Sequence, residues 1–301
     1  MYHYVRDVAG TRFPRLKALP VDAFRRQVDA LRATHEMATW ESLASFLSGE
    51  YVPRRDLCYL TFDDGLREHH ETVLPILQER GVKAAFFVIT GCANHEVMAT
   101  VHQSQLLAAV LDEDQLLGRF RNGLAELAPG TSVEVDDEAA RRTYRWDSRA
   151  MAGYKYLINV QLPVTLRETV IALLCAQELG DLRALAGDHY MGWGEIDELH
   201  RCGMVVGGHT HFHRALSSLT ATEQRDDLTR CYGLLASRLG VSGAGIPFCY
   251  PYGSPDAFTS ESAKLVRASG FVAGFTAIAG RVRSGDDPYT LRRFDTRDVV
   301  A

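Results

Sequence analysis

The sequence predicts an α/β fold with a parallel sheet at its centre. Residues 57–62 and 83–89 are short, continuously apolar segments, and residues 71–81 between them have a helical pattern that ends at a glycine. The lack of polar alternation in both apolar segments is typical of strands buried on both faces. Because strand and helix patterns alternate again after residue 190, we expect helices on both faces of the sheet.

Two amphipathic helices are predicted before the first strand. Residues 20–33 and 39–49 carry apolar side chains at helical spacing, and the second segment ends at a glycine. After residue 190 another helix is expected to begin at Thr220, which forms a capping box with Glu223. The other elements expected in this part are helices at 193–203 and 261–270 and strands at 204–208, 246–250 and 271–276.

The middle of the chain has a different pattern. From about residue 93 to 190 the sequence contains helical segments such as 103–120 and 164–180, with few convincing strands. A length of 301 residues fits one core with a large insertion as well as it fits two domains. We expect one domain over residues 1–301, interrupted by a mainly helical insertion at about 93–190.

Composition excludes several classes of protein. The formal net charge is −5 and there is no block of Lys or Arg, so nucleic acid is not an expected partner. No apolar run approaches the about 18 residues that a membrane helix needs, and residues 1–15 lack the apolar core of a signal peptide. We therefore expect a cytoplasmic protein with no transmembrane segment. The six scattered cysteines, none in a C-x-x-C pair, are expected to be reduced.

Polar motifs follow three of the predicted strands. Asp63 and Asp64 follow residues 57–62, the segment HTHFH at 209–213 follows the strand at 204–208, and PYG at 251–253 follows the strand at 246–250. Chemistry in parallel α/β folds gathers at the carboxyl ends of the strands. The three motifs should therefore lie together and form one site.

A divalent metal explains the composition of these motifs. His209 and His213 share a face if their segment is helical, and His211 joins them if it is extended. With Asp64 they supply two nitrogens and one oxygen, a set that leaves coordination positions open for water and substrate. The adjacent Asp63 then remains free to take a proton from a water acidified by the cation. The alternatives are a plain acidic turn and histidines satisfied by hydrogen bonds.

These motifs resemble a known family. TFDDG, the H-T-x-x-H of HTHFH, and FCYPYG resemble the first three motifs of the polysaccharide deacetylase superfamily, the NodB-homology domain, over residues 57 to about 90 and 191 to about 278. The resemblance implies a distorted (β/α) barrel that removes acetyl groups from N-acetylated sugars with one divalent metal. Zinc is the usual ion, and other divalent ions stay open. The helical insertion is outside the resemblance.

The resemblance also implies roles for single residues. Asp63 would be the general base, and Asp64, His209 and His213 the metal ligands. Tyr252 matches the residue whose backbone N–H helps to hold the tetrahedral oxyanion. His211 falls between the ligand positions and would be a wall residue.

The sequence departs from the family pattern at two places. Cys249 stands where many members have an arginine that pairs with the base, and Arg293, or alternatively Arg292, could supply that charge from near the C-terminus. A solvated basic pair is the competing interpretation of these arginines. The late motif that supplies the acid for the leaving amine is not recognisable. The candidates are His3, which could instead be a surface residue, His211, or Asp63 acting twice.

We therefore expect a metal-dependent carbohydrate N-deacetylase that acts on an N-acetylated amino sugar, such as a nucleotide-linked or lipid-linked precursor of a surface glycan. The alternatives are a non-catalytic carbohydrate-binding or assembly module, an iron oxygenase with two histidines and one carboxylate, and a phosphoryl-transfer enzyme. The sequence leaves the sugar, the acyl group, the carrier and the oligomeric state open. Aromatic side chains of the insertion would either stack on sugar rings or, as favoured, form the insertion's own core; these are Tyr144, Trp146, Tyr154 and Tyr156.

Overall fold

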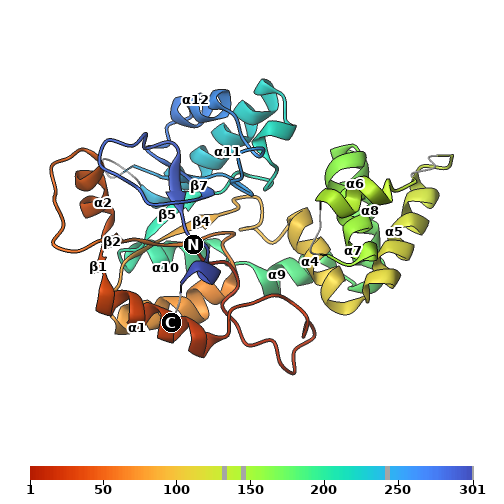
Figure 1. Ribbon diagram of the computed structural model, residues 1–301, viewed down its shortest axis with the longest axis horizontal. Helices are drawn as coiled ribbons and strands as arrows, with labels where there is room; N and C mark the ends of the chain where they lie inside the picture. Colours follow the sequence, from red (N-terminus) through yellow and green to blue (C-terminus); the bar gives the residue numbers. More distant parts are fainter. Residues whose placement is uncertain (131–133, 144–146, 241–244, 300–301) are drawn as a thin grey trace. The chain divides into compact units, whose positions relative to one another are not determined.

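A computed structural model describes residues 1–130, 134–143, 147–240 and 245–299 (Figure 1). The chain forms two compact units. We call the first the barrel unit; it consists of Met1–Asp7, Ala18–Val97 and Ala186–Ala301. We call the second the helical unit; it consists of Val8–Lys17 and Met98–Leu185. The predicted single domain with an insertion at about 93–190 stays a prediction.

The barrel unit is built on a six-stranded sheet in which every pair of neighbouring strands is parallel. The strands follow one another in space in the order in which they occur in the sequence, and the sheet curls into a half-barrel. This confirms the predicted α/β class. The strands are β3 (Leu60–Phe62), β4 (Ala84–Val88), β5 (Val205–Gly208), β6 (Phe248–Cys249), β7 (Gly274–Ala279) and β8 (Leu291–Arg293). The sequence pattern did not predict β8.

The first residues of the chain lie against both edges of this sheet. Tyr2 pairs in parallel with Phe62 of β3, and its backbone hydrogen-bonds Thr61 and Asp63. The backbone nitrogen of Met1 donates to the carbonyl of Phe294, directly after β8, at 2.6 Å. The segment therefore bridges the two ends of the half-barrel and brings His3 to the carboxyl end of β3.

Helices cover the sheet, and their boundaries are close to those predicted. The predicted helix at 71–81 begins earlier, as a π-helix at His69, and the predicted strand at 57–62 is divided into β2 and β3. The capping box at Thr220 is present. The remaining elements of the barrel unit are α1 (Val21–Thr34), β1 (Glu36–Met37), α2 (Trp40–Leu47), β2 (Leu57–Cys58), η1 (His69–Val73), α3 (Leu74–Glu79), α10 (Trp193–Arg201), η3 (Leu216–Ser218), α11 (Ala221–Leu239), α12 (Ser260–Ala268) and η4 (Thr296–Asp298).

The helical unit has no strand among its described residues, and its helices bury an aromatic core of their own. Tyr154 is buried, hydrogen-bonds Ser104 at 2.8 Å and packs edge-on against Phe120, so it belongs to this core. Tyr144 and Trp146 lie outside the described residues. The helices are α4 (Thr100–Val110), α5 (Glu113–Leu127), α6 (Asp137–Thr143), α7 (Arg149–Tyr156), η2 (Leu157–Gln161), α8 (Val164–Glu178) and α9 (Leu182–His189), of which α9 continues into the barrel unit.

Two expectations from composition can be compared with the structure. None of the described helices is long and apolar enough to cross a membrane. All six cysteines are free, and four of them are buried. These four cysteines therefore pack in the interior as small hydrophobic residues do.

An aromatic cluster joins α1 to the sheet. Phe24 is fully buried, and its ring lies edge-on at 5.2 Å from Tyr2 and 5.8 Å from Phe62, while Phe62 stacks on Phe86 at 4.8 Å. These rings hold the N-terminal segment, α1 and the start of the sheet together.

We expect Phe24→Ala to destabilise the barrel unit by about 3–5 kcal/mol, because the change removes buried surface and leaves a cavity. Urea unfolding followed by circular dichroism measures this loss. Val52→Ala is the control, since Val52 is 85% exposed and its loss should cost less than about 0.5 kcal/mol. A cost below about 1 kcal/mol for Phe24→Ala would contradict the packing described.

Candidate functional site

The three polar motifs meet at one edge of the sheet. Asp63 and Asp64 follow β3, residues 209–213 follow β5, and residues 251–253 follow β6. Because these strands are parallel, their carboxyl ends lie on the same side, as the sequence led us to expect.

Asp64, His209 and His213 form a compact group of ligand atoms. Oδ1 of Asp64 lies 3.3 Å from Nε2 of His209 and 3.2 Å from Nε2 of His213, and all three ligand atoms lie within 4.8 Å of one another. The three side chains are buried. One carboxylate oxygen and two imidazole nitrogens suit a divalent ion such as zinc and leave coordination positions open. The residues present therefore fit the metal that the sequence led us to expect.

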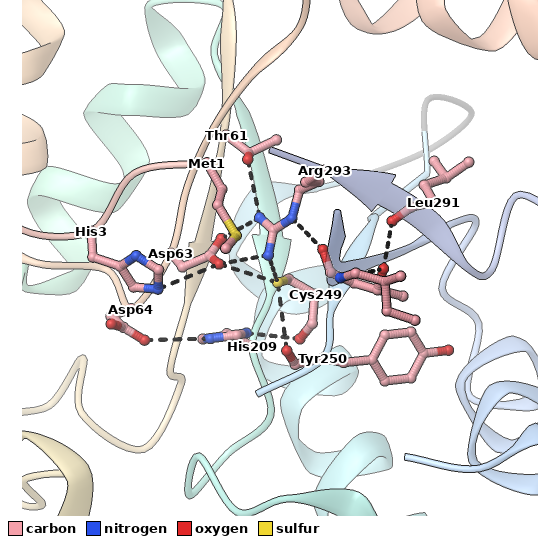
Figure 2. Close-up of polar contacts among 12 residues, drawn as sticks. Met1, His3, Thr61, Asp63, Asp64, His209, Cys249, Tyr250, Leu291 and Arg293 are labelled. Atoms are coloured by element: carbon pink, nitrogen blue, oxygen red, sulfur yellow. Dashed lines mark hydrogen bonds and ion pairs between the residues drawn. The ribbon is translucent and has the colours of Figure 1, made fainter. Parts of the chain in front are cut away.

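A hydrogen bond to the backbone orients the ring of His209 at this site. Its Nδ1 lies 2.7 Å from the carbonyl oxygen of Cys249, which can only accept, so Nδ1 carries a proton and Nε2 is the nitrogen that faces Asp64 (Figure 2). Burial lowers the pKa of His209, but Cys249 and Asp64 raise it more, and the net shift is upward. The site thus favours a positive charge beside its carboxylates.

The turn that carries the histidines is neither helical nor extended. Thr210 and His213 have φ of 61° and 56°, and Oγ1 of Thr210 accepts a hydrogen bond from the backbone N–H of His213 at 2.9 Å. Asp64 and Tyr252 also have positive φ, so four of the five such non-glycine residues in the described parts of the chain lie in these motifs. Such backbone strain persists only where the surroundings enforce it, and it gathers at functional sites.

Asp63 has a separate cationic partner. The guanidinium of Arg293 donates to both carboxylate oxygens of Asp63 at 2.8 Å, and it also donates to Thr61 Oγ1 and to the carbonyl of Thr276 (Figure 2). Burial raises the pKa of Asp63, but the charge and hydrogen bonds of Arg293 outweigh burial and hold the pKa well below its ordinary value. Asp63 is therefore ionised. Arg293 is buried, whereas Arg292 is exposed.

A second possible metal group, Asp63 with His209 and Cys249, is less suited to a cation. Nη2 of Arg293 lies 3.0 Å from Sγ of Cys249 and also contacts Asp63, so a fixed positive charge already faces both ligands. Burial raises the pKa of the Cys249 thiol, which keeps it protonated and a weak ligand. The group that contains Asp64 is therefore the better candidate for a metal site.

The remaining predicted residues lie around this centre. Nε2 of His3 is 3.8 Å from Oδ2 of Asp63 (Figure 2). The side chain of His3 is 42% exposed. The ring of Tyr252 is 5.1 Å from the ring of His213, and Tyr252 is 47% exposed. His211 is buried, and its Nδ1 hydrogen-bonds Thr90 at 2.9 Å.

The sequence analysis missed Asp227 of α11. Its carboxylate oxygens accept the backbone N–H groups of His211 at 2.6 Å and Phe212 at 3.3 Å, so it fixes the turn that carries the histidines. Asp227 is buried on the same face of α11 as Leu228 and Cys231. An acidic residue on an apolar face was the signal that could have revealed it.

Residues 187–191 were also missed, and they hold the turn after Asp64. The backbone N–H of Met191 donates to the carbonyl of Gly65 at 3.0 Å, and Tyr190 pairs with Leu66. Arg67 donates to the carbonyl of Gly187. No local sequence pattern predicts these contacts, because they join residues that are 120 or more positions apart in the sequence.

Comparisons with known proteins agree with this architecture. The family model described as polysaccharide deacetylase matches residues 51–121 and 174–273, which is more than half of the chain. No curated protein matches the sequence significantly. The chain is similar in structure to IcaB from Ammonifex degensii, with 21% identity, a TM-score of 0.58, and coverage of 99% of this chain and 90% of that one.

Two further solved structures share the fold. The deacetylase PplD of Streptococcus pyogenes, solved in complex with acetate, has 15% identity and a TM-score of 0.59, with 98% of this chain and 89% of that chain covered. The BpsB deacetylase domain of Bordetella bronchiseptica has 15% identity and a TM-score of 0.52, with 89% and 82% covered.

The chain thus has the α/β half-barrel fold of carbohydrate deacetylases. It belongs to the polysaccharide deacetylase family. The predicted fold class and the family resemblance are both confirmed, and membership makes the chain a hydrolase of the carbohydrate deacetylase class.

The pair of Asp63 and Arg293 gives a prediction about stability and pH. Replacing Arg293 by Met leaves a buried carboxylate without its guanidinium partner and should cost about 3–5 kcal/mol at neutral pH. In the wild type the pKa of Asp63 is depressed, so the stabilisation by the pair is complete above pH about 4. In Arg293→Met the largest force opposing burial is lost and that pKa rises, so stability relative to wild type falls as pH rises above about 4.

Urea unfolding of both proteins at pH 4.5 and pH 7.5, without added metal, measures this difference. We expect the free energy of unfolding of the two proteins to differ more at pH 7.5 than at pH 4.5. We also expect the double variant Asp63→Asn with Arg293→Met to regain part of the stability that Arg293→Met loses. Equal gaps at the two pH values, with no recovery in the double variant, would contradict the charge pairing.

Proposed function

We propose that the protein hydrolyses the N-acetyl amide of an amino sugar with one divalent metal ion, zinc first among the candidates. The observation that carries this proposal is the division of labour between two adjacent buried carboxylates. Asp64 faces two imidazoles that suit a metal, while Asp63 is held ionised by Arg293. A binding module has no need for this costly arrangement.

In the proposed reaction Asp63 acts as the general base. It accepts a proton from the water that attacks the acyl carbonyl carbon, and the C–N bond then breaks to give acetate and a free amine. A divalent ion bound by Asp64, His209 and His213 would polarise the acyl carbonyl. It would also lower the pKa of the attacking water, so that a base with a pKa as low as that of Asp63 could accept its proton. The backbone N–H of Tyr252 is proposed to stabilise the negative charge that develops on the carbonyl oxygen.

The amine must gain a proton as it leaves. His3 is the proposed donor, because its Nε2 lies 3.8 Å from Asp63 on the accessible side of the site. A hydrogen bond from Nε2 of buried His69 to the backbone carbonyl of His3, at 2.9 Å, supports its position. His211 is a weaker candidate, because burial and then the charge of Arg230 lower its pKa to about 4 and leave it neutral. Asp63 acting twice is the remaining alternative.

The identity of the substrate stays a prediction. A nucleotide-linked or lipid-linked precursor of a surface glycan, and a cytoplasmic setting, were expected from the sequence. Screening N-acetylated nucleotide sugars, lipid-linked sugars and long polymers for release of acetate separates these substrates. Activity confined to long polymers would overturn the expectation of a precursor.

Two other functions use the same residues. A site with two histidines and one carboxylate also serves iron oxygenases, and uptake of dioxygen by the iron-loaded protein would favour that chemistry. A non-catalytic module would bind acetylated sugars without releasing acetate. The adjacent Asp63 with its dedicated Arg293 has no role in either alternative.

The proposed base gives a direct prediction. Asp63→Asn should lower the rate of acetate release by about 100-fold to 10,000-fold and leave the bound zinc unchanged, because Asp63 is not a ligand in the assigned site. Rates on the most active substrate of the screen and elemental analysis measure the two effects. Asp22→Asn, an exposed change of the same kind on α1, is the control. A wild-type rate in Asp63→Asn would overturn the assignment of the base.

A further inference from the structure

Exposed aromatic side chains flank one of the metal-ligand candidates. Phe212, the residue before His213, is 38% exposed, and Tyr252, whose ring faces His213, is 47% exposed. The described parts of the chain expose four other large hydrophobic side chains, none of which belongs to the three polar motifs: Val52, Leu127, Val272 and Phe294. Exposed aromatic side chains therefore lie beside the buried His213 at this site.

Two guanidinium groups lie close to the ring of Phe212. The guanidinium carbon of Arg214 lies 5.5 Å from the centre of the ring, and that of Arg230, on α11, lies 5.8 Å from it. A guanidinium held near an aromatic ring is partly ordered in advance and weakly hydrated, while its five N–H donors point outward in its own plane. Such groups recognise phosphate or carboxylate oxygens with two parallel hydrogen bonds.

Arg230 lies near one buried acid, Asp227, whose pKa is raised by burial and lowered in part by the charge of Arg230, but the two do not form an ion pair in the described structure. Arg230 is exposed and forms no ion pair with any residue that the structure describes. The nearby acid Asp227 is buried and uses its oxygens on the backbone N–H groups of His211 and Phe212. Since the whole chain carries a net charge of −5, this positive charge is local to the site and does not reflect a basic protein.

We propose that Phe212, Arg214 and Arg230 form a subsite for an anionic group, a phosphate or a carboxylate, attached to the acetylated sugar. Phe212 directly precedes His213 in the chain, so the subsite belongs to the same turn as this metal-ligand candidate. The subsite would hold the sugar by its charged substituent while the acetamido group reaches the catalytic centre. This inference rests on the proposed function and narrows its substrate class.

The experiment compares acetate release from three probes. N-acetylglucosamine is neutral, N-acetylglucosamine 1-phosphate carries a phosphate, and N-acetylmuramic acid carries a carboxylate. We expect Arg230→Gln to lower kcat/KM roughly tenfold on the charged probe that the subsite accepts, mainly through KM, and to change the neutral probe less than about twofold. Arg225→Gln, an exposed arginine on the same helix, is the matched control and should change neither.

Each outcome decides the inference. If Arg230→Gln lowers kcat/KM on the phosphate probe alone or on the carboxylate probe alone, that probe identifies which anion the subsite binds. Equal effects of Arg230→Gln on charged and neutral probes, or equal effects of Arg230→Gln and Arg225→Gln, would overturn the subsite. Added sodium chloride should raise KM for the accepted charged probe in the wild type and less so in Arg230→Gln.

A binding measurement separates this inference from the proposed function. Calorimetry measures binding of each charged probe to the Asp63→Asn protein with and without Arg230→Gln. If no probe releases acetate but Arg230→Gln weakens binding, the subsite stands and the proposed activity fails. If Arg230→Gln leaves binding of both charged probes unchanged, the subsite is wrong whatever the enzyme does.

Discussion

Two adjacent buried carboxylates at the end of β3 impose the constraint on which the site depends. Each would be protonated or expelled from the interior unless it had a cationic partner of its own. The side chains of Asp63 and Asp64 point apart because the two residues are adjacent in the chain, so each can meet a different partner. Arg293 of β8 reaches Asp63, and the turn after β5 brings His209 and His213 to Asp64. The closing of the sheet by residues 1–2 and the strained backbone after β5 both serve this arrangement.

Cys249 explains how an arginine from a distant strand can reach Asp63, the proposed base. It lies at the end of β6, and its small side chain leaves room for the guanidinium of Arg293, 3.0 Å from the sulfur. The carbonyl of Cys249 also orients His209. Cys249 thus contributes to both halves of the site: its small side chain leaves room beside Asp63, and its backbone carbonyl orients one of the candidate metal ligands.

The sequence predicted those features that depend on local patterns. Apolar runs marked most of the strands, and the strand-end rule placed Asp63, Asp64 and the histidines together. The turn at 209–213 was not predicted, because positive φ at Thr210 and His213 depends on tertiary contacts such as that with Asp227. The strand β8 is short and was not recognised, and the choice of Arg293 over Arg292 came from a family resemblance.

Calorimetric titration of the metal-free protein with zinc tests the central claim most directly. Wild type and Cys249→Ser should bind one ion with similar affinity, while Asp64→Asn should lose binding, because the ion is assigned to Asp64, His209 and His213 and not to the neighbouring group of Asp63, His209 and Cys249. Retained binding in Asp64→Asn, together with loss in Cys249→Ser, would contradict the account.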